Sequence, residues 1–413
     1  MKNIFCCLLL VCLSLGNSAC KKDNSPRNVQ PAKPITLTTK QAEKLSGDNA
    51  FAFNLFREIA TSGNKENAFI SPLSVTMALG MLFNGTSPDA RAEMATALGI
   101  SDFSDTEVNE YYQTLYRALL NIDPLTAISI ANSIWCKQGY PVKPTFIEIN
   151  RNYFDAAVQT LDFSLPSTLK AINMWCAQKT NDKITSILDV ISEDAVMYLI
   201  NAVYFKSKWQ FEFDKKDTKK EKFTLENGAQ VNLDMMNQTA TLPYYANEML
   251  QCIEMPYGNQ AFSMVAILPN EGITLDDLVN HLDHNAWENI LSNLWERNVQ
   301  IKFPRFKQEC KFQLREPIYN LGMHLIFLEG GNLNGIAEDP ELCVSRIIHK
   351  TFVEVNEEGT EAAAVTAIEV VATSVGPPSG PISFFANRPF LYLIKEKSTG
   401  AILFIGRMDQ PMG

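Results

Sequence analysis

Four histidines and nine cysteines are the side chains of this 413-residue chain that could bind a metal or supply a base or a nucleophile. His281 and His284 lie three residues apart, a spacing that places two side chains on one face of a helix. The residues around the pair are mostly Asp and Asn, which favours a solvent-exposed surface. We therefore predict that the chain binds no metal.

The cysteines divide into a group within the first twenty residues and a scattered group in the rest of the chain. The scattered group is odd in number and has no C-x-x-C pair, so neither a disulfide framework nor a zinc site is expected. Most of its members have apolar neighbours, which favours buried free thiols over a catalytic cysteine. The first group is Cys6, Cys7, Cys12 and Cys20, and the second is Cys136, Cys176, Cys252, Cys310 and Cys343.

Sequence motifs of the common enzyme classes are absent from the chain. There is no H-E-x-x-H, no G-x-S-x-G, no G-x-x-x-x-G-K-[ST] and no G-x-G-x-x-G. A triad assembled from distant residues would leave no such motif, but nothing in the sequence favours one. We predict a protein that is not an enzyme and that needs no cofactor.

Residues 360–374 have an unusual composition for one continuous segment. With a period of two, both of its charges fall on one face, which is the pattern of a strand with one buried side. Its five alanines make it a weak strand, and the Gly- and Pro-rich stretch 376–381 that follows reads as an exposed connection. A segment suited to both loop and strand is a candidate conformational switch, although residues 357–364 also suit an ordinary helix. One face carries Thr360, Ala362, Ala364, Thr366, Ile368 and Val370, and the other carries Glu361, Ala363, Val365, Ala367, Glu369 and Val371.

Helical patterns occupy the first part of the chain, up to about residue 120. Apolar residues at helical spacing follow Asp48, which we expect to cap the helix. A second helix is predicted to start at Ser71 and Pro72 and to end at Asn84 and Gly85.

Strands dominate the second half of the predicted structure. Apolar runs predict buried strands at residues 199–205, 262–268 and 299–303. Two further strands, 390–394 and 401–405, are joined across residues 398–400 and predict a hairpin.

The overall composition is that of an ordinary globular protein, and its length suggests two or three domains. The formal net charge of -10 argues against nucleic acid or heparin as a partner, because both are polyanions. The chain also contains one run of lysines. We interpret it as a solvated loop, because acidic residues lie between the lysines. The run is Lys215, Lys216, Lys219, Lys220 and Lys222.

The N-terminus reads as an export signal. Lys2 precedes an apolar stretch, residues 4–15, that is too short to serve as a stable membrane span. The small residues before Cys20 resemble a bacterial lipoprotein signal, which implies a signal peptide at 1–19, a lipid on Cys20 and a polar tether at 20–38. We expect a cell-envelope lipoprotein, on the outer membrane or the cell surface. Asn17 departs from the lipoprotein pattern, so plain secretion after cleavage near Ala19 is the alternative.

Residues 357–364, Glu-Glu-Gly-Thr-Glu-Ala-Ala-Ala, resemble the hinge of inhibitory serpins almost residue for residue. Four further segments resemble serpin motifs in the same order: 67–74, 173–184, 201–209 and the stretch from Asn387 to Arg407. The resemblance covers residues 39–413. It implies an α+β fold in one monomeric domain, with about nine helices, three β-sheets and an exposed reactive-centre loop at about 357–381.

The resemblance also implies a mechanism and a set of roles. A protease would cut the loop and become covalently attached, and the freed hinge would then insert into the largest sheet. The implied shutter is Ser71, Asn201 and His349, the implied breach residue is Trp175, and Glu357 is expected to pair with Arg305. The implied hinge consists of Glu357, Glu358, Gly359, Thr360, Glu361, Ala362, Ala363, Ala364, Val365 and Thr366.

The class of protease is suggested by the residues that the loop lacks. Counting fourteen residues on from Gly359, as in most inhibitory serpins, places the reactive bond between Thr373 and Ser374. Residues 351–387 contain no Lys or Arg and 353–383 no aromatic, which disfavours trypsin-like and chymotrypsin-like enzymes. We expect an elastase-like or subtilisin-like target, with papain-type cysteine proteases as a further class. A non-inhibitory serpin, acting as a chaperone or carrier, is the alternative.

Overall fold

The computed structural model describes residues 31–61, 67–192, 194–360 and 380–411. Several predictions concern residues outside these ranges and stay predictions. They are the signal peptide, Cys20, the reactive bond Thr373–Ser374, and the hinge residues Glu361, Ala362, Ala363, Ala364, Val365 and Thr366.

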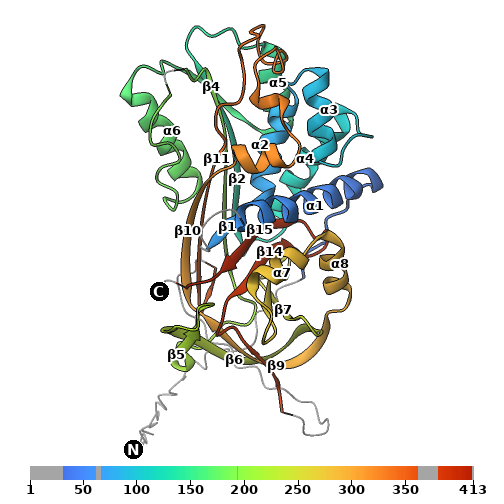
Figure 1. Ribbon diagram of the computed structural model, residues 1–413, viewed down its shortest axis with the longest axis vertical. Helices are drawn as coiled ribbons and strands as arrows, with labels where there is room; N and C mark the ends of the chain where they lie inside the picture. Colours follow the sequence, from blue (N-terminus) through green and yellow to red (C-terminus); the bar gives the residue numbers. More distant parts are fainter. Residues whose placement is uncertain (1–30, 62–66, 193, 361–379, 412–413) are drawn as a thin grey trace, which may run out of the picture.

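Helices gather around one half of the molecule, and strands dominate the other (Figure 1). The described residues form nine α-helices and two short 3₁₀ helices. The α-helices are α1 (Thr39–Thr61), α2 (Pro72–Phe83), α3 (Pro88–Ala97), α4 (Asp105–Asn121), α5 (Pro144–Phe154), α6 (Pro166–Lys179), α7 (Leu275–His281), α8 (His284–Ser292) and α9 (Arg315–Asn320), and the 3₁₀ helices are η1 (Lys215–Asp217) and η2 (Leu325–Phe327).

The strands of the described residues form two sheets. The nine-stranded sheet has the order β1 (Ala68–Ile70), β15 (Ile402–Met408), β14 (Phe390–Glu396), β8 (Phe262–Pro269), β7 (Leu250–Pro256), β6 (Gln230–Ala246), β9 (Trp295–Pro304) and β13 (Ile382–Phe385), with β5 (Lys219–Thr224) paired to β6. The six-stranded sheet has the order β10 (Phe306–Gln313), β11 (Ile348–Asn356), β12 (Gly359–Thr360), β4 (Met197–Lys208), β2 (Ala127–Lys137) and β3 (Ala157–Leu161).

The long strand β6 explains why the described strands form two sheets where the resemblance implies three. It pairs with β9 over residues 235–244 and with β7 over residues 244–246. One strand therefore joins two groups of strands into a continuous sheet, and the α+β fold itself agrees with the expectation.

Most predicted elements appear close to their predicted positions. Ser71 caps α2 by accepting a hydrogen bond from the Ser74 amide, with Pro72 at the first helical position. β14 and β15 pair antiparallel as the predicted hairpin. Four of the five described cysteines are buried and all five are free thiols, as expected.

The first helix differs from the prediction at its start. α1 begins at Thr39, so Asp48 lies inside the helix and does not cap it. Asp48 is buried and pairs with Lys44 one turn earlier, and it accepts a hydrogen bond of 2.8 Å from the hydroxyl of Tyr111. The prediction that Asp48 caps the helix is therefore wrong, because its carboxylate forms a buried ion pair inside the helix.

The six-stranded sheet lies between helices: α6 covers one face, and α1, α2 and α4 lie on the other (Figure 1). Residues 31–38, assigned above to the tether, lie against the body of the protein. Ala32 donates its amide hydrogen to Asn259 O (3.2 Å), and Ala32, Ile35 and Leu37 pack on the main core. Within the described ranges, no helix has the length and apolar character needed to span a membrane.

Candidate functional site

The described end of the predicted hinge forms a two-residue strand within the six-stranded sheet. β12 pairs antiparallel with β11 on one side and with β4 on the other. Thr360 stands opposite Val355 of β11 and Ser207 of β4. Glu357, Glu358 and Thr360 are all buried. Gly359 and Thr360 thus already belong to the sheet, and Glu357 and Glu358 form the turn that leads into it.

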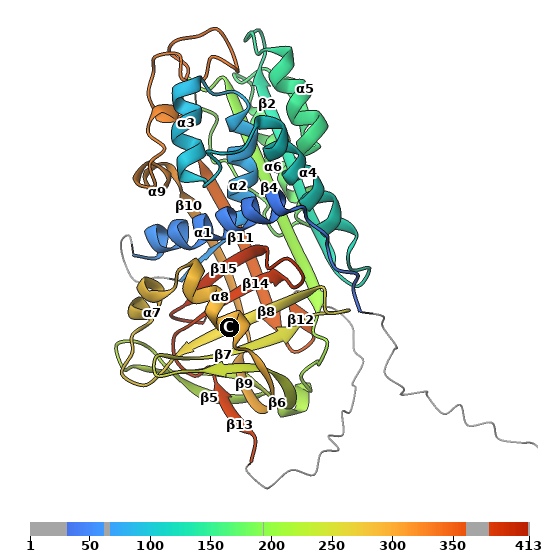
Figure 2. The same cartoon turned by 90° about the vertical axis from the view of Figure 1, so that its right-hand side faces the viewer.

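β12 also separates the two strands beside it. The strand order runs β11, β12, β4, and no pairing joins β4 directly to β11 within the described residues. Both strands extend well beyond β12, so the edges that face one another there have no strand partner among those residues. An unpaired strand edge presents backbone donors and acceptors that a further strand can satisfy. Figure 2 shows β12 where the end of β4 meets the strand-rich half.

Among the hinge residues that the structure describes, Gly359 has a backbone conformation that demands glycine. Its φ of +151° is rarely adopted by residues with a side chain. A Cβ atom there would lie 2.1 Å from the carbonyl oxygen of Ser207. Glycine therefore allows the hinge to approach β4 closely enough to pair with it.

The chain that follows β4 holds the turn between β11 and β12. The amide of Trp209 donates to Glu358 O and the amide of Phe213 to Glu357 O, both at 2.9 Å. The indole Nε1 of Trp209 donates to Asn356 O, also at 2.9 Å. Because three carbonyls of the turn are bound from one side, the turn has a fixed position relative to β4.

The two hinge glutamates have partners that differ in part from the prediction. Arg305 lies near Glu357 as expected, but its Nη1 is 3.9 Å from Oε1, whereas the hydroxyl of Thr218 donates to the same oxygen at 2.9 Å. Lys215 Nζ lies 2.6 Å from Glu358 Oε1, and this hydrogen bond raises the pKa of Lys215. Lys215 was assigned to a solvated loop. Its side chain is half exposed, but the lysine run lies in regular structure, because η1 contains Lys215 and Lys216 and β5 contains the other three lysines. Sequence reasoning missed its contact with the hinge, because nothing local to the run indicates it.

Trp175 does not lie beside the hinge. It sits on α6, where its ring meets Trp135 of β2 edge to face, with centroids 6.1 Å apart. The tryptophan that contacts the hinge is Trp209, directly after β4. The assignment of Trp175 to the breach is therefore corrected to Trp209. Its signal in the sequence was its place at the end of the serpin-like segment 201–209.

Ser71 and His349 meet as the resemblance implies, whereas Asn201 lies apart from them. The Ser71 amide donates to His349 Nε2 at 2.9 Å, and the Ser71 hydroxyl donates to Leu403 O at 2.7 Å. Asn201 of β4 instead donates to Asn132 Oδ1 of β2 at 2.5 Å, and its own Oδ1 is buried without a hydrogen-bond partner. The implied shutter is thus divided between the β11 side and the β4 side of the sheet.

His349 is neutral in this setting. Burial lowers its pKa to about 4, because the charged imidazolium would lose its hydration. The hydrogen bond from Ser71 requires the same state, since Nε2 must keep its lone pair to accept it.

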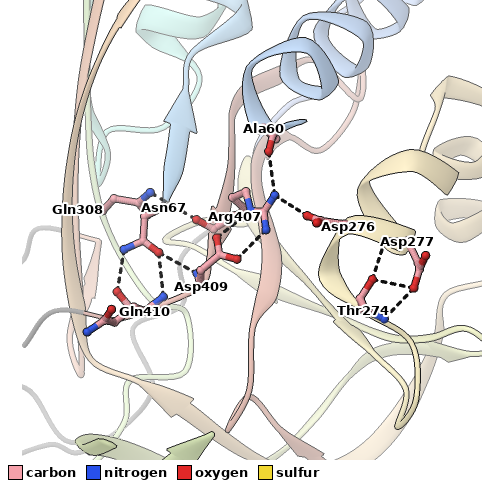
Figure 3. Close-up of polar contacts among 9 residues, drawn as sticks. All are labelled: Ala60, Asn67, Thr274, Asp276, Asp277, Gln308, Arg407, Asp409 and Gln410. Atoms are coloured by element: carbon pink, nitrogen blue, oxygen red, sulfur yellow. Dashed lines mark hydrogen bonds and ion pairs between the residues drawn. The ribbon is translucent and has the colours of Figure 1, made fainter. Parts of the chain in front are cut away.

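Arg407 anchors the segment that follows the loop (Figure 3). It is fully buried on β15 and binds Asp409 through two hydrogen bonds, of 2.7 Å from Nε and 2.6 Å from Nη2. Nη1 donates to two acceptors, Asp276 Oδ1 at the start of α7 and Ala60 O of α1, both at 2.9 Å. This cation therefore ties the C-terminal strand to two helices.

The rival enzyme functions find little support in the described part of the chain. Ser46 Oγ and His284 Nε2 lie 2.8 Å apart, but His284 Nδ1 is buried and has no hydrogen-bond partner. A serine–histidine pair needs an acceptor at that nitrogen to orient the ring as a base. No group of three or more His, Cys, Asp and Glu side chains suited to a metal occurs among the described residues.

Comparison with known families matches residues 46–411 to the family described as "Serpin (serine protease inhibitor)". The chain belongs to the serpin family. An uncharacterized serpin-like protein of Thermococcus kodakarensis is 33% identical over 88% of this chain and 84% of its own length. The leukocyte elastase inhibitor of Sus scrofa is 33% identical over 89% of this chain and 100% of its own.

Among solved structures, the thermophilic serpin tengpin in its native state is similar to this serpin, with a TM-score of 0.82. The two are 32% identical, and the match covers 92% of this chain and 97% of tengpin. The fold class predicted from the sequence is confirmed.

Proposed function

We propose that this serpin inhibits serine endopeptidases as a suicide substrate, by inserting its cleaved loop between β4 and β11. One observation carries the proposal: β12 already lies between these strands, whose facing edges beyond Thr360 have no strand partner among the described residues. Adding a strand there would satisfy two backbone edges at once, a gain of free energy that an ordinary protease substrate does not have.

The proposed chemistry begins as normal proteolysis. The catalytic serine oxygen of the protease adds to the carbonyl carbon of Thr373, and the bond to Ser374 breaks as the Ser374 amine takes up a proton. The protease is then an ester of the inhibitor, which water would hydrolyse in an ordinary substrate. Insertion of the freed loop competes with that hydrolysis and carries the attached protease away from its productive geometry.

The register of β12 defines where the loop would go. Thr360 faces Ser207, so residues 361–370 continued in the same register would face residues 206–197 of β4. Thr360 points into the buried side of the sheet, and Ala362 and Ala364 would follow on that side. Small side chains there support rapid insertion because they have least to displace.

The target class rests on the loop sequence and on one relative. Val370, Val371, Ala372 and Thr373 suit shallow apolar pockets, and residues 351–387 have no basic residue for a trypsin-like pocket. The relative from Sus scrofa is named as an inhibitor of leukocyte elastase. We therefore assign elastase-like or subtilisin-like proteases as targets, with papain-type cysteine proteases as a second group.

Incubation with an elastase-type protease, followed by a denaturing gel, tests the proposal. The expected product of the natural chain is a covalent band heavier than either protein. Thr360→Arg is the matched variant, because a charge at a buried position opposite Ser207 should block insertion and leave only cleaved chain and active protease. If the natural chain is also merely cleaved, the protein is a non-inhibitory serpin.

We further propose that Cys20 carries a lipid that holds the inhibitor on the cell envelope. The small residues before Cys20 support this proposal. The natural chain, expressed in a bacterium, is expected in the membrane fraction, and Cys20→Ala in the soluble fraction. Equal release of both forms would favour plain secretion.

A further inference from the structure

Tyr257 lies directly after β7 and contacts the hinge with its hydroxyl. Its Oη is 2.6 Å from Thr360 Oγ1, and both side chains are buried. The phenol ring stacks on the indole of Trp209, with centroids 4.4 Å apart and planes within 9°. Phe205 meets the same ring edge-on at 5.4 Å. Aromatic contacts on two sides thus fix the direction of the hydroxyl.

The backbone around Tyr257 is tied to β4, the strand with which the hinge pairs. Tyr257 forms an isolated β-bridge with Trp209, and the next amide, that of Gly258, donates to Lys208 O at 2.8 Å. Gly258 has a φ of +44°, and a Cβ atom there would lie 2.5 Å from Asp123 Oδ2. The position of the hydroxyl is therefore set by the same strand end that receives Gly359 and Thr360.

Thr360 is the last described hinge residue, and its hydroxyl is buried against Tyr257. A buried hydroxyl without a partner costs free energy, so the hydrogen bond favours the one register in which the two groups meet. A shift by one residue would turn the Thr360 side chain to the opposite face of the sheet.

We infer that Tyr257 is a positioning residue for loop insertion, which holds Thr360 in register as the fixed starting point from which the loop inserts. This inference rests on the proposed function. With the starting pair in place, insertion after cleavage extends an existing strand. Without it, the pair must first form, which gives water more time to hydrolyse the acyl-enzyme.

Tyr257→Phe tests the inference, because it keeps the ring stacked on Trp209 and removes only the hydroxyl. We measure the number of inhibitor molecules consumed per protease inactivated, together with the thermal midpoint. Loss of one buried neutral hydrogen bond is expected to raise that number about threefold to tenfold. Tyr392→Phe is the matched control: its hydroxyl is also buried and donates to Gln308 Oε1 at 2.6 Å, away from the hinge. This control is expected to lower the thermal midpoint without changing the number of inhibitor molecules consumed per protease inactivated.

The partner residue gives an independent measurement. Thr360→Val removes the other hydroxyl at nearly constant volume and is expected to raise the number of inhibitor molecules consumed as Tyr257→Phe does. Thr360→Ser restores a hydroxyl and is expected to recover most of the inhibition. The double variant Tyr257→Phe/Thr360→Val should consume no more inhibitor per protease inactivated than either single variant, because both substitutions remove the same interaction.

The outcomes separate this inference from the proposed function. If the natural chain forms no covalent complex with the protease, the proposed function fails. If it does, but Tyr257→Phe and Thr360→Val consume no more inhibitor than the natural chain, the positioning role is wrong. Additive effects in the double variant would also overturn it.

Discussion

His349 is a buried base whose neutral form holds two parts of the molecule together. It accepts a hydrogen bond from the backbone of Ser71, where α2 begins, while lying on β11 of the six-stranded sheet. Protonation would both bury a charge and remove the lone pair that Ser71 uses.

Acid should therefore destabilise the folded protein through this residue. The pKa of His349 is about 4 when folded and ordinarily 6.5 when unfolded, so the unfolded chain binds the proton first as the pH falls. The stabilisation is complete above pH 6.5 and is lost between pH 6.5 and 4, amounting to about 3 kcal/mol.

His349→Gln provides the comparison, because glutamine does not titrate. When the pH is lowered from 7.5 to 4.5, the denaturant midpoint should fall further for the natural chain than for this variant. An equal fall in both would assign the acid sensitivity to carboxylates elsewhere.

Single residues also show where sequence reasoning succeeds and where it ends. Ser71 was predictable as a helix cap because its partner, the Ser74 amide, is three residues away. Tyr257, Lys215 and Thr218 were not, because each meets the hinge across more than a hundred residues of chain. Trp175 was misassigned because its distance from the hinge depends on the fold, although the place of Trp209 at the end of segment 201–209 gave a signal in the sequence.

At the scale of elements, the turn between β11 and β12 is bound by the segment that follows β4. Its backbone bonds come from Trp209 and Phe213, and its side-chain bonds from Lys215 and Thr218. The hinge is therefore held from the β4 side, whereas the resemblance pointed to Arg305 on the β9–β10 side.

Two charge-removing variants can rank these contacts. Lys215→Met should lower the thermal midpoint and promote premature opening more than Arg305→Met. Lys215 Nζ lies 2.6 Å from a buried carboxylate, and Arg305 Nη1 lies 3.9 Å from one that Thr218 already binds. The monomer fraction after mild heating measures the opening. A larger loss of monomer for Arg305→Met than for Lys215→Met would show that the contact between Arg305 and Glu357 is the dominant one.

The elements themselves were largely predictable, because apolar periodicity is local. Strands such as β8 and β14 are mostly apolar in sequence and stay buried along their whole length. The joining of two sheets by β6 was not predictable, since it depends on which partners a single long strand meets at its two ends.

At the scale of the whole molecule, Arg407 connects the last strand to α1 and α7. Its guanidinium is fully buried and balanced by two carboxylates, those of Asp409 and Asp276. Removing one partner of such a group leaves uncompensated charge in the interior.

Arg407→Met should therefore cost about 3–5 kcal/mol of unfolding free energy, measured by denaturant titration. Lys311→Met removes an ion pair of similar length, 2.6 Å to Asp189, whose side chains are exposed. This control should change stability little. Comparable losses in both variants would contradict the anchoring role of Arg407.

The anchoring of the C-terminal segment has a consequence for the inhibited state. Cutting the bond between Thr373 and Ser374 would divide the inhibitor into two chains, and residues 374–413 would have no covalent link to the rest. That peptide contains β13, β14 and β15, which pair with β9, β8 and β1, and it contains Arg407. It should stay bound through native purification and separate only on denaturation. In each covalent complex, the first residue of the retained peptide would thus identify the bond of the inhibitor that the protease cut.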